Sequence, residues 1–130
     1  MRTRRLLATV VASSALLLIG CGGNESSLNV AVAESQTVDV SQAILIDVRD
    51  VSEFEAGHLP NALNIPFNDG SLKTQLSTMD PDAAYVLYCR SGNRSRQAAA
   101  MMAEAGFDNV VDLGGLEDAV DATGLELVTD

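Results

Sequence analysis

The fold is decided by the stretch Tyr85-Val86-Leu87-Tyr88-Cys89-Arg90-Ser91-Gly92-Asn93-Arg94-Ser95-Arg96. Its first four residues are aliphatic, β-branched or aromatic, which is typical of a buried strand. The residues that follow it, 97–105, are rich in alanine and methionine and favour a helix. Cys89 therefore lies where a strand ends and a loop leads into a helix. Gly92 gives that loop backbone angles that other residues avoid.

A loop of this kind is suited to binding an anion. Successive backbone N–H groups converge on one point, and the start of the following helix adds its positive end. Arg90, Arg94 and Arg96 lie within seven consecutive positions, beside the cysteine. Nearby cations and a helix N-terminus favour a thiolate over a thiol, so the pKa of Cys89 is expected to be lowered. The sequence thus predicts an anion-binding loop with a nucleophile at its base.

Segments on both sides of this stretch alternate between strand and helix patterns. Ser52 is expected to cap the first helix. A nearly continuous apolar run such as Ala43–Val48 is typical of a parallel strand buried on both faces. We therefore expect an α/β fold with a mainly parallel five-stranded sheet and helices on both faces. The expected strands are 36–38, 43–48, 64–65, 85–88 and 109–112, and the expected helices are 53–56, 71–78, 97–105 and 116–122.

Composition limits the possible partners. The 130 residues carry a net charge of −10, and loss of Arg2, Arg4 and Arg5 would leave five basic against 18 acidic residues, a net charge of −13. Nucleic acids and anionic membrane surfaces attract proteins through a basic face. We therefore expect no nucleic-acid partner.

The N-terminus has the pattern of an export signal. Three arginines precede the apolar run Leu6–Ile19, which is shorter than the ~20 residues of a comfortable membrane span. The sequence Leu18-Ile19-Gly20-Cys21 resembles a bacterial lipobox, in which Cys21 receives lipid; the alternative is a plain secretory signal. We expect a signal peptide at 1–20, a flexible tether at 21–35 and a folded domain at 36–130. The protein would lie in the bacterial cell envelope, facing the periplasm or the outside, with the lipid as its only membrane contact.

The loop Cys-Arg-Ser-Gly-Asn-Arg-Ser resembles the active-site loop of the rhodanese (thiosulfate sulfurtransferase) family. Three other segments agree with that family in the same order, and together the resemblance covers about residues 36–124. They are Ile46-Asp47-Val48-Arg49, the segment from Glu53-Phe54 to Gly57-His58-Leu59-Pro60 and on to Pro66, and Gly114-Gly115-Leu116. An aromatic residue often follows the last segment in the family, whereas Asp118-Ala119-Val120 stand there in this chain.

The resemblance implies a rhodanese-like fold and a sulfurtransferase without cofactor or metal. Cys89 would take a sulfane sulfur from a small anionic donor such as thiosulfate, carry it as a persulfide, and pass it to cyanide or a thiol. The phosphatases and arsenate reductases with a related cysteine loop have one more residue between the cysteine and the arginine, so the shorter loop here favours sulfur chemistry. The alternative is a non-catalytic module that binds or senses persulfide or sulfide. The residues expected to bind the donor are Arg90, Ser91, Gly92, Asn93 and Arg94.

Four further polar residues are expected to be structural. Asp47, Arg49 and Glu53 could form a catalytic charge cluster, but an ion-pair network at the strand-to-helix corner is favoured, in agreement with the resemblance. His58 could serve in acid–base catalysis or metal binding. A single histidine without suitably spaced cysteines or carboxylates makes a poor metal site, so a structural role in its Gly-His-Leu-Pro turn is favoured.

Overall fold

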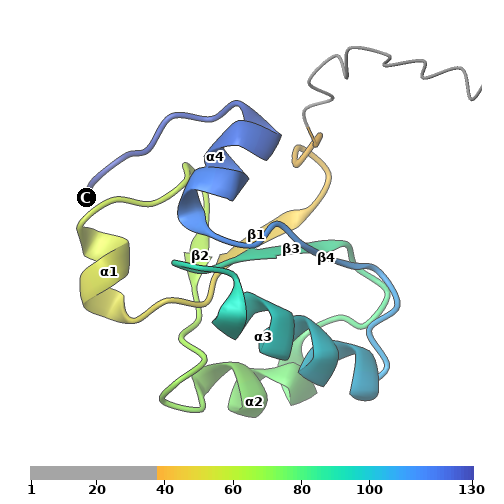
Figure 1. Ribbon diagram of the computed structural model, residues 1–130. Helices are drawn as coiled ribbons and strands as arrows, with labels where there is room; N and C mark the ends of the chain where they lie inside the picture. Colours follow the sequence, from red (N-terminus) through yellow and green to blue (C-terminus); the bar gives the residue numbers. More distant parts are fainter. Residues whose placement is uncertain (1–37) are drawn as a thin grey trace, which may run out of the picture. The chain divides into compact units, whose positions relative to one another are not determined.

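The computed structural model describes residues 38–130, which form an α/β domain around a parallel sheet (Figure 1). The strands are β1 (Ile44–Asp47), β2 (Leu63–Asn64), β3 (Tyr85–Tyr88) and β4 (Val110–Asp112), in the order β2-β1-β3-β4. The helices are α1 (Val51–Glu55), α2 (Ser71–Gln75) with the 3-10 turn η1 (Leu76–Thr78), α3 (Asn93–Glu104) and α4 (Leu116–Thr123).

The two central strands are the most apolar ones. β1 and β3 pair in parallel over their full length, with Ile44 beside Tyr85 and Asp47 beside Tyr88. All four residues of β3 are buried, and so are the last three of β1. Their near-continuous apolar sequences follow from this position, because a central parallel strand is covered on both faces.

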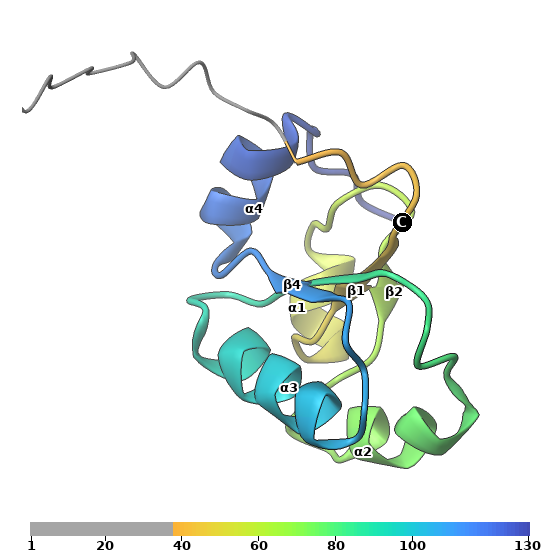
Figure 2. The same ribbon diagram turned by 90° about the vertical axis from the view of Figure 1, so that its right-hand side faces the viewer.

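Helices cover both faces of the sheet, as the sequence predicted. Figures 1 and 2 show α4 on one face and α2 and α3 on the other. Side chains of β3 alternate between two cores, since successive residues of a strand point to opposite faces. The core on the α2 and α3 face includes Tyr85, Leu87 and Cys89, whereas Val86 and Tyr88 belong to the core on the α4 face.

The mainly parallel sheet is confirmed, and its described part has four strands. The fifth strand was expected at 36–38, which lies outside the described residues except for Val38, and Val38 is not in a strand. The expected signal peptide, tether and lipidation site at Cys21 also lie outside the described residues. Among residues 38–130, no helix has the length and apolar character needed to cross a bilayer.

Two helix starts differ from the prediction. Helix α3 begins at Asn93 rather than at 97, because Gly92, with φ of 88°, turns the chain directly into the helix. Helix α1 begins at Val51, and Asp50 rather than Ser52 is its N-cap residue. The Asp50 N–H donates to the Glu53 carboxylate at 3.2 Å, which satisfies a donor that precedes the first turn.

Candidate active site

The strand order places Cys89 at the switch point of the sheet. From β1 the chain proceeds outward to β2, and from β3 it proceeds outward to β4 on the other side. Ligands of open parallel sheets bind in the crevice beyond the carboxyl ends of strands at such a point. Cys89 directly follows β3, and Arg49 and Asp50 follow β1, so the residues that continue both central strands meet there.

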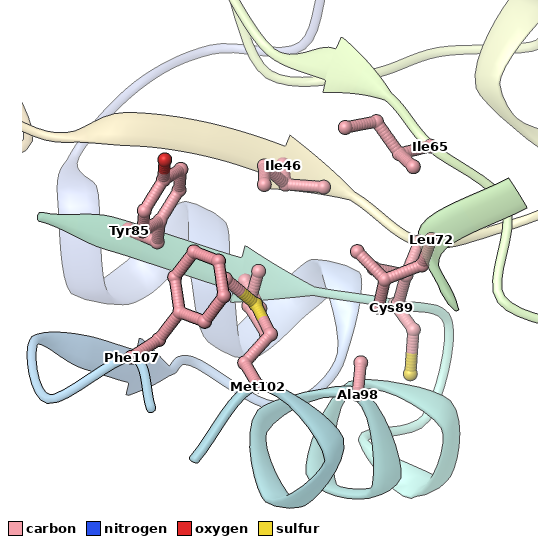
Figure 3. Packing of buried hydrophobic residues seen from close by; sticks show 10 residues of the cluster. Ile46, Ile65, Leu72, Tyr85, Cys89, Ala98, Met102 and Phe107 are labelled. Carbon is pink, nitrogen blue, oxygen red and sulfur yellow. The ribbon is translucent and has the colours of Figure 1, made fainter. Parts of the chain in front are cut away.

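Cys89 is a buried side chain at the base of the loop that leads to α3. Its residue has no exposed surface, and it lies on the same side of the sheet as Ala98 and Met102 of α3 (Figure 3). The Cys89 N–H donates to the Gly114 carbonyl at 2.9 Å. The start of the loop is therefore hydrogen-bonded to the segment between β4 and α4.

Hydrogen bonds from the loop surround the sulfur atom. The Gly92 N–H donates to Cys89 Sγ at 3.0 Å. Burial opposes ionisation of the thiol, but donors from the Ser95 side chain and from the Ser95, Ser91 and Gly92 backbone outweigh it and lower the pKa of Cys89. The Ser95 N–H is available because the first N–H groups of a helix have no partner within it. The sulfur thus lies in an anion-binding loop, where its charged form is favoured.

Ser95 is a site residue that the sequence reasoning missed. Its side chain is fully buried, and its Oγ lies 3.2 Å from the Gly92 carbonyl oxygen and 3.3 Å from that of Gly114. The hydroxyl therefore joins the loop, the start of α3 and the segment after β4. A serine in the first turn of the helix after the cysteine was the available signal, because its side chain and N–H both point back toward the loop.

The loop packs too closely against the Gly114-Gly115 segment for a side chain there. A Cβ on Gly115 would lie 2.9 Å from the Arg90 carbonyl oxygen, a distance that real Cβ atoms essentially never show. The Leu116 N–H lies 3.4 Å from that same carbonyl oxygen, and Ser91 forms an antiparallel bridge with Gly115. The Gly114-Gly115 segment thus packs directly against the loop that follows Cys89.

Arg94 is held in an ion pair and is not a free cation above the thiol. Its guanidinium donates to both carboxylate oxygens of Glu53, at 2.6 and 2.9 Å, and lies 3.6 Å from the Asp50 carboxylate. The hydrogen bonds from Arg94 lower the pKa of Glu53 to about 2, although desolvation acts in the opposite direction. Glu53 in turn raises the pKa of Arg94. The charge of Arg94 is thus offset by Glu53 of α1, and the expected role of Arg94 in donor binding stays a prediction.

A second buried pair lies where β1 ends. Arg49 forms a salt bridge of 2.6 Å with Asp47, and its guanidinium also donates to the Gly57 carbonyl at 2.7 Å. Burial disfavours the charged guanidinium, but the hydrogen bond and charge of Asp47 outweigh it and raise the pKa of Arg49. The same guanidinium lies over the Tyr88 ring, 5.7 Å from its centroid. This network stabilises the turn between β1 and α1, and it contacts Tyr88, the residue before Cys89.

His58 contacts both helix α1 and the C-terminal segment. Its ring stacks on Phe54 with centroids 3.7 Å apart, and its Nδ1 lies 2.9 Å from the Phe54 carbonyl oxygen. Its backbone exchanges two hydrogen bonds of 2.9 Å with Val128. These contacts place His58 at the end of α1 and connect that helix to the C-terminal segment.

The other expected donor-binding residues lie at the surface of the loop. The Asn93 side chain accepts hydrogen bonds from Arg96 and Gln97 at 3.2 and 3.4 Å, so it is directed along α3. Arg90 and Ser91 are exposed and line a cleft of about 360 Å³, together with residues from the start of α4. In the part of the chain that the structure describes, no group of three or more His, Cys, Asp or Glu side chains is placed to hold a metal ion.

Comparisons with known proteins agree on one family. The family model for the Rhodanese-like domain matches residues 28–122. A sulfurtransferase of Allochromatium vinosum is 35% identical over 59% of this chain and 70% of its own length. Thiosulfate sulfurtransferase GlpE of Pseudomonas savastanoi pv. phaseolicola is 30% identical over 63% of this chain and 76% of its own length.

A solved structure described as a rhodanese with anions from E. coli has the same fold. It aligns with a TM-score of 0.59 and 29% identity, over 68% of this chain and 99% of its own. The thiol in its loop of N–H donors, the parallel sheet and these relatives lead to one assignment. The chain belongs to the rhodanese-like domain family, whose members include sulfurtransferases.

Proposed function

We propose that this protein transfers a sulfane sulfur from an anionic donor such as thiosulfate to a thiol or cyanide, through a persulfide on Cys89. The observation that carries the proposal is the arrangement around Sγ. The N–H groups of Ser91, Gly92 and Ser95 and the Ser95 hydroxyl favour the thiolate at a buried position. A thiolate is the reactive form of cysteine, and donors fixed in advance stabilise a negative sulfur without rearranging during the reaction.

The first step forms the persulfide. The Cys89 thiolate attacks the outer sulfur of thiosulfate, a new sulfur–sulfur bond forms, and the bond within thiosulfate breaks with its electron pair leaving on sulfite. The negative charge then lies on the outer sulfur of the persulfide. The same loop donors that favour the thiolate are close to this charge, since Sγ and the outer sulfur are directly bonded. No general base is needed when the thiolate is already present.

Cationic side chains have separate roles in this proposal. Arg90 is exposed at the loop, and in the described part of the chain it forms no ion pair, so it is the side chain that attracts the anionic donor. Arg94 is bound to Glu53 and holds the start of α3, which carries the N–H of Ser95. Arg94 therefore acts on the donor mainly by positioning the loop.

The second step returns the enzyme to its starting state. A thiolate or cyanide attacks the outer sulfur of the persulfide, and the sulfur–sulfur bond breaks with its electron pair on Cys89 Sγ. Cyanide would leave as thiocyanate, and a thiol would leave as its own persulfide. The chain needs no cofactor for either step, because each is a displacement at sulfur.

A thiosulfate:cyanide assay on the full chain tests the proposal. We expect thiocyanate from the wild type and none from Cys89→Ser, because serine keeps nearly the same volume but offers no thiolate. Circular dichroism establishes that the variant is folded. Equal thiocyanate production by the wild type and a folded Cys89→Ser variant would contradict the proposal.

A persulfide-holding module without turnover is the second candidate, and the burial of Cys89 favours it. Because Cys89 has no exposed surface, an acceptor reaches a persulfide there only after neighbouring groups move. In that case the wild type would gain a sulfur on Cys89 from thiosulfate but would release no thiocyanate. The same assay, followed by mass spectrometry of Cys89, separates the two functions.

We also propose that the protein acts in the cell envelope, anchored by lipid on Cys21. The support is the sequence Leu18-Ile19-Gly20-Cys21 directly after an apolar run. In a bacterial host the wild type is then expected in the detergent-soluble membrane fraction, and Cys21→Ala in the aqueous fraction. Equal partition of both proteins would count against the anchor.

A further inference from the structure

We propose that Glu53 and Asp50 select the sulfur donor by its charge, and that they favour a donor with one negative charge over a dianion such as thiosulfate. The inference rests on the proposed function and deepens it, because that function leaves the charge class of the donor open. Organic thiosulfonates and simple persulfide anions are donors of the favoured kind, since each carries a sulfane sulfur and a single negative charge.

Arg94, to which both carboxylates are close, lies on the side of the sheet to which the Cys89 side chain points. Cys89 packs in the same core as Ala98 of α3, and Figure 3 shows both on this side. Arg94 precedes Ala98 by four residues, so the two share one face of α3. Ser95, the residue after Arg94, contributes its hydroxyl and its N–H to the donors around Sγ. The guanidinium therefore belongs to the end of α3 that surrounds the sulfur.

Two carboxylates neighbour this one guanidinium. Glu53 accepts hydrogen bonds from Arg94 at 2.6 and 2.9 Å, and the Asp50 carboxylate lies 3.6 Å away. The Glu53 hydrogen bonds raise the pKa of Arg94 against desolvation, and the charges of Glu53, Cys89 and Asp50 act in the same upward direction. The thiolate and these three side chains thus interact electrostatically. One positive and two negative charges leave Arg94, Glu53 and Asp50, which we call the Arg94 cluster, with a net charge of −1.

Holding the start of α3 does not account for the second carboxylate. Glu53 binds both terminal nitrogens of the Arg94 guanidinium. Asp50 is half-exposed, and at 3.6 Å it adds negative charge rather than a hydrogen bond. The Arg94 and Glu53 side chains are only 18% and 24% exposed, so their charges are screened less than charges on an open surface. The excess negative charge is therefore available to act on an approaching anion.

This charge acts on a donor through space as it nears the loop, so the donor need not touch either carboxylate. Coulomb energy is proportional to the charge of the donor, and each carboxylate therefore repels thiosulfate twice as strongly as it repels a monoanion. The Cys89 thiolate adds a further negative charge with the same preference. For charges a few ångströms apart in salt solution, removal of one carboxylate changes a rate by about two- to threefold per unit charge of the donor.

Thiosulfate and the methanethiosulfonate anion are the matched donors, because they differ by one charge at the same kind of sulfur–sulfur bond. In both, the Cys89 thiolate attacks the outer sulfur, and a persulfide forms as the bond within the donor breaks. The electron pair leaves on sulfite in the first case and on methanesulfinate in the second. No oxidant or reductant is consumed in either reaction.

The full chain is incubated with each donor below saturation at an ionic strength of about 0.1 M, where the Debye length is about 10 Å. The gain of one sulfur on the Cys89 peptide is timed by mass spectrometry. For each donor the rate of a variant is divided by that of the wild type, and the thiosulfate ratio is then divided by the methanethiosulfonate ratio. In this quotient the intrinsic reactivity of the donors cancels, and so does any loss of loop geometry that slows both donors equally.

The two carboxylates predict the quotient of each variant. Glu53→Gln should raise it by about two- to threefold, because a negative charge beside the loop is lost. Asp50→Asn should raise it by about twofold, since Asp50 is more exposed, and asparagine is an equally good N-cap residue for α1. Glu53→Asp keeps the charge, so its quotient should stay near one even if both rates fall.

Glu104→Gln is the matched control, because it removes an exposed carboxylate from the same helix that carries Arg94. Glu104 is the last residue of α3, ten residues or ~15 Å along the helix from Arg94 and thus beyond the Debye length. Its quotient should be near one. Circular dichroism establishes that each variant is folded.

The outcomes separate this inference from the proposed function. If Asp50→Asn and Glu53→Gln are folded and both quotients stay at one, selection by charge is refuted while persulfide formation stands. If Glu53→Asp raises the quotient as much as Glu53→Gln, geometry rather than charge is responsible, and the inference is again refuted. The same holds if Glu104→Gln raises it equally, because the general charge of the protein then suffices. If neither donor adds sulfur to wild-type Cys89, the proposed function fails, and this inference fails with it.

Discussion

Replacement of Ser95 by alanine should raise the pKa of Cys89. The Ser95 hydroxyl is the largest of the interactions that favour the thiolate. Its one proton has three possible acceptors: Cys89 Sγ and the carbonyl oxygens of Gly92 and Gly114, which lie 3.2 and 3.3 Å from Oγ. When the Cys89 thiol is neutral, the Ser95 hydroxyl can donate its proton to a carbonyl oxygen. When the thiol is ionised, the hydroxyl donates to the sulfur instead.

The size of the effect follows from this exchange of partners. A hydrogen bond to a charged group contributes about 1.5–3 kcal/mol. The wild-type hydroxyl gives up a bond to a carbonyl when it turns to the sulfur, which reduces the net effect toward the lower end. We therefore expect Ser95→Ala to raise the pKa of Cys89, because the thiolate loses about 1.5 kcal/mol of stabilisation relative to the thiol. Alanine fits the buried position without a clash.

The pKa is measured from the pH dependence of alkylation by iodoacetamide, with the Cys89 peptide followed by mass spectrometry so that Cys21 does not interfere. Ser91→Ala is the matched control, because Ser91 contributes its backbone N–H, which the substitution keeps, and its side chain is exposed. Identical titration curves for wild type and Ser95→Ala would refute the assigned role of the hydroxyl. So would an equal shift in Ser91→Ala.

Three further substitutions probe the supports of the site. Glu53→Gln should lower the free energy of unfolding by about 1–2 kcal/mol, which lies between the values for exposed and buried ion pairs. The extra stability of the wild type over this variant should disappear as the pH falls from about 4.5 toward 2, because the Glu53 carboxyl, with a pKa of about 2, is then protonated. Urea unfolding at several pH values measures both effects. If the free energy of unfolding falls equally with pH in the wild type and in Glu53→Gln, the stabilising role of the Glu53–Arg94 ion pair is contradicted. Tyr88→Phe should cost about 1–3 kcal/mol, because the buried Leu59 N–H loses its 3.0 Å bond to the Tyr88 hydroxyl, and an unchanged urea midpoint would contradict this. Gly115→Ala should slow sulfur transfer more than it lowers stability, because its Cβ would force the loop carbonyl 2.9 Å away to move; wild-type transfer rates would show that the loop tolerates the shift.

The local features of the fold could be predicted from the sequence. The apolar runs at β1 and β3, the position of Cys89 at the end of β3 and the alternation of strands and helices all follow from neighbouring residues. The start of α3 was placed four residues late, since Asn93 to Arg96 are polar and resemble a loop. Their helical conformation depends on Gly92, which redirects the chain, and on the segment after β4.

The pairing of charges could not be predicted in the same way. Arg94 and Glu53 are 41 residues apart, and their contact depends on how α1 and α3 sit at the ends of β1 and β3. The sequence showed three arginines beside a cysteine, but not that one of them would be neutralised by a carboxylate. Ser95 was missed for a related reason, because its hydroxyl is recognised as a donor only once the loop and the Gly114 carbonyl are side by side.

The central claim is that Cys89 accepts a sulfur atom and carries it in its loop as a persulfide anion. Its most direct test is the mass of the Cys89 peptide after the full chain has been incubated with thiosulfate and alkylated without reduction. We predict a peptide heavier by one sulfur atom, present in the wild type and absent after addition of cyanide. A Cys89 peptide that is alkylated but carries no additional sulfur, from a protein shown to be folded, would contradict the account.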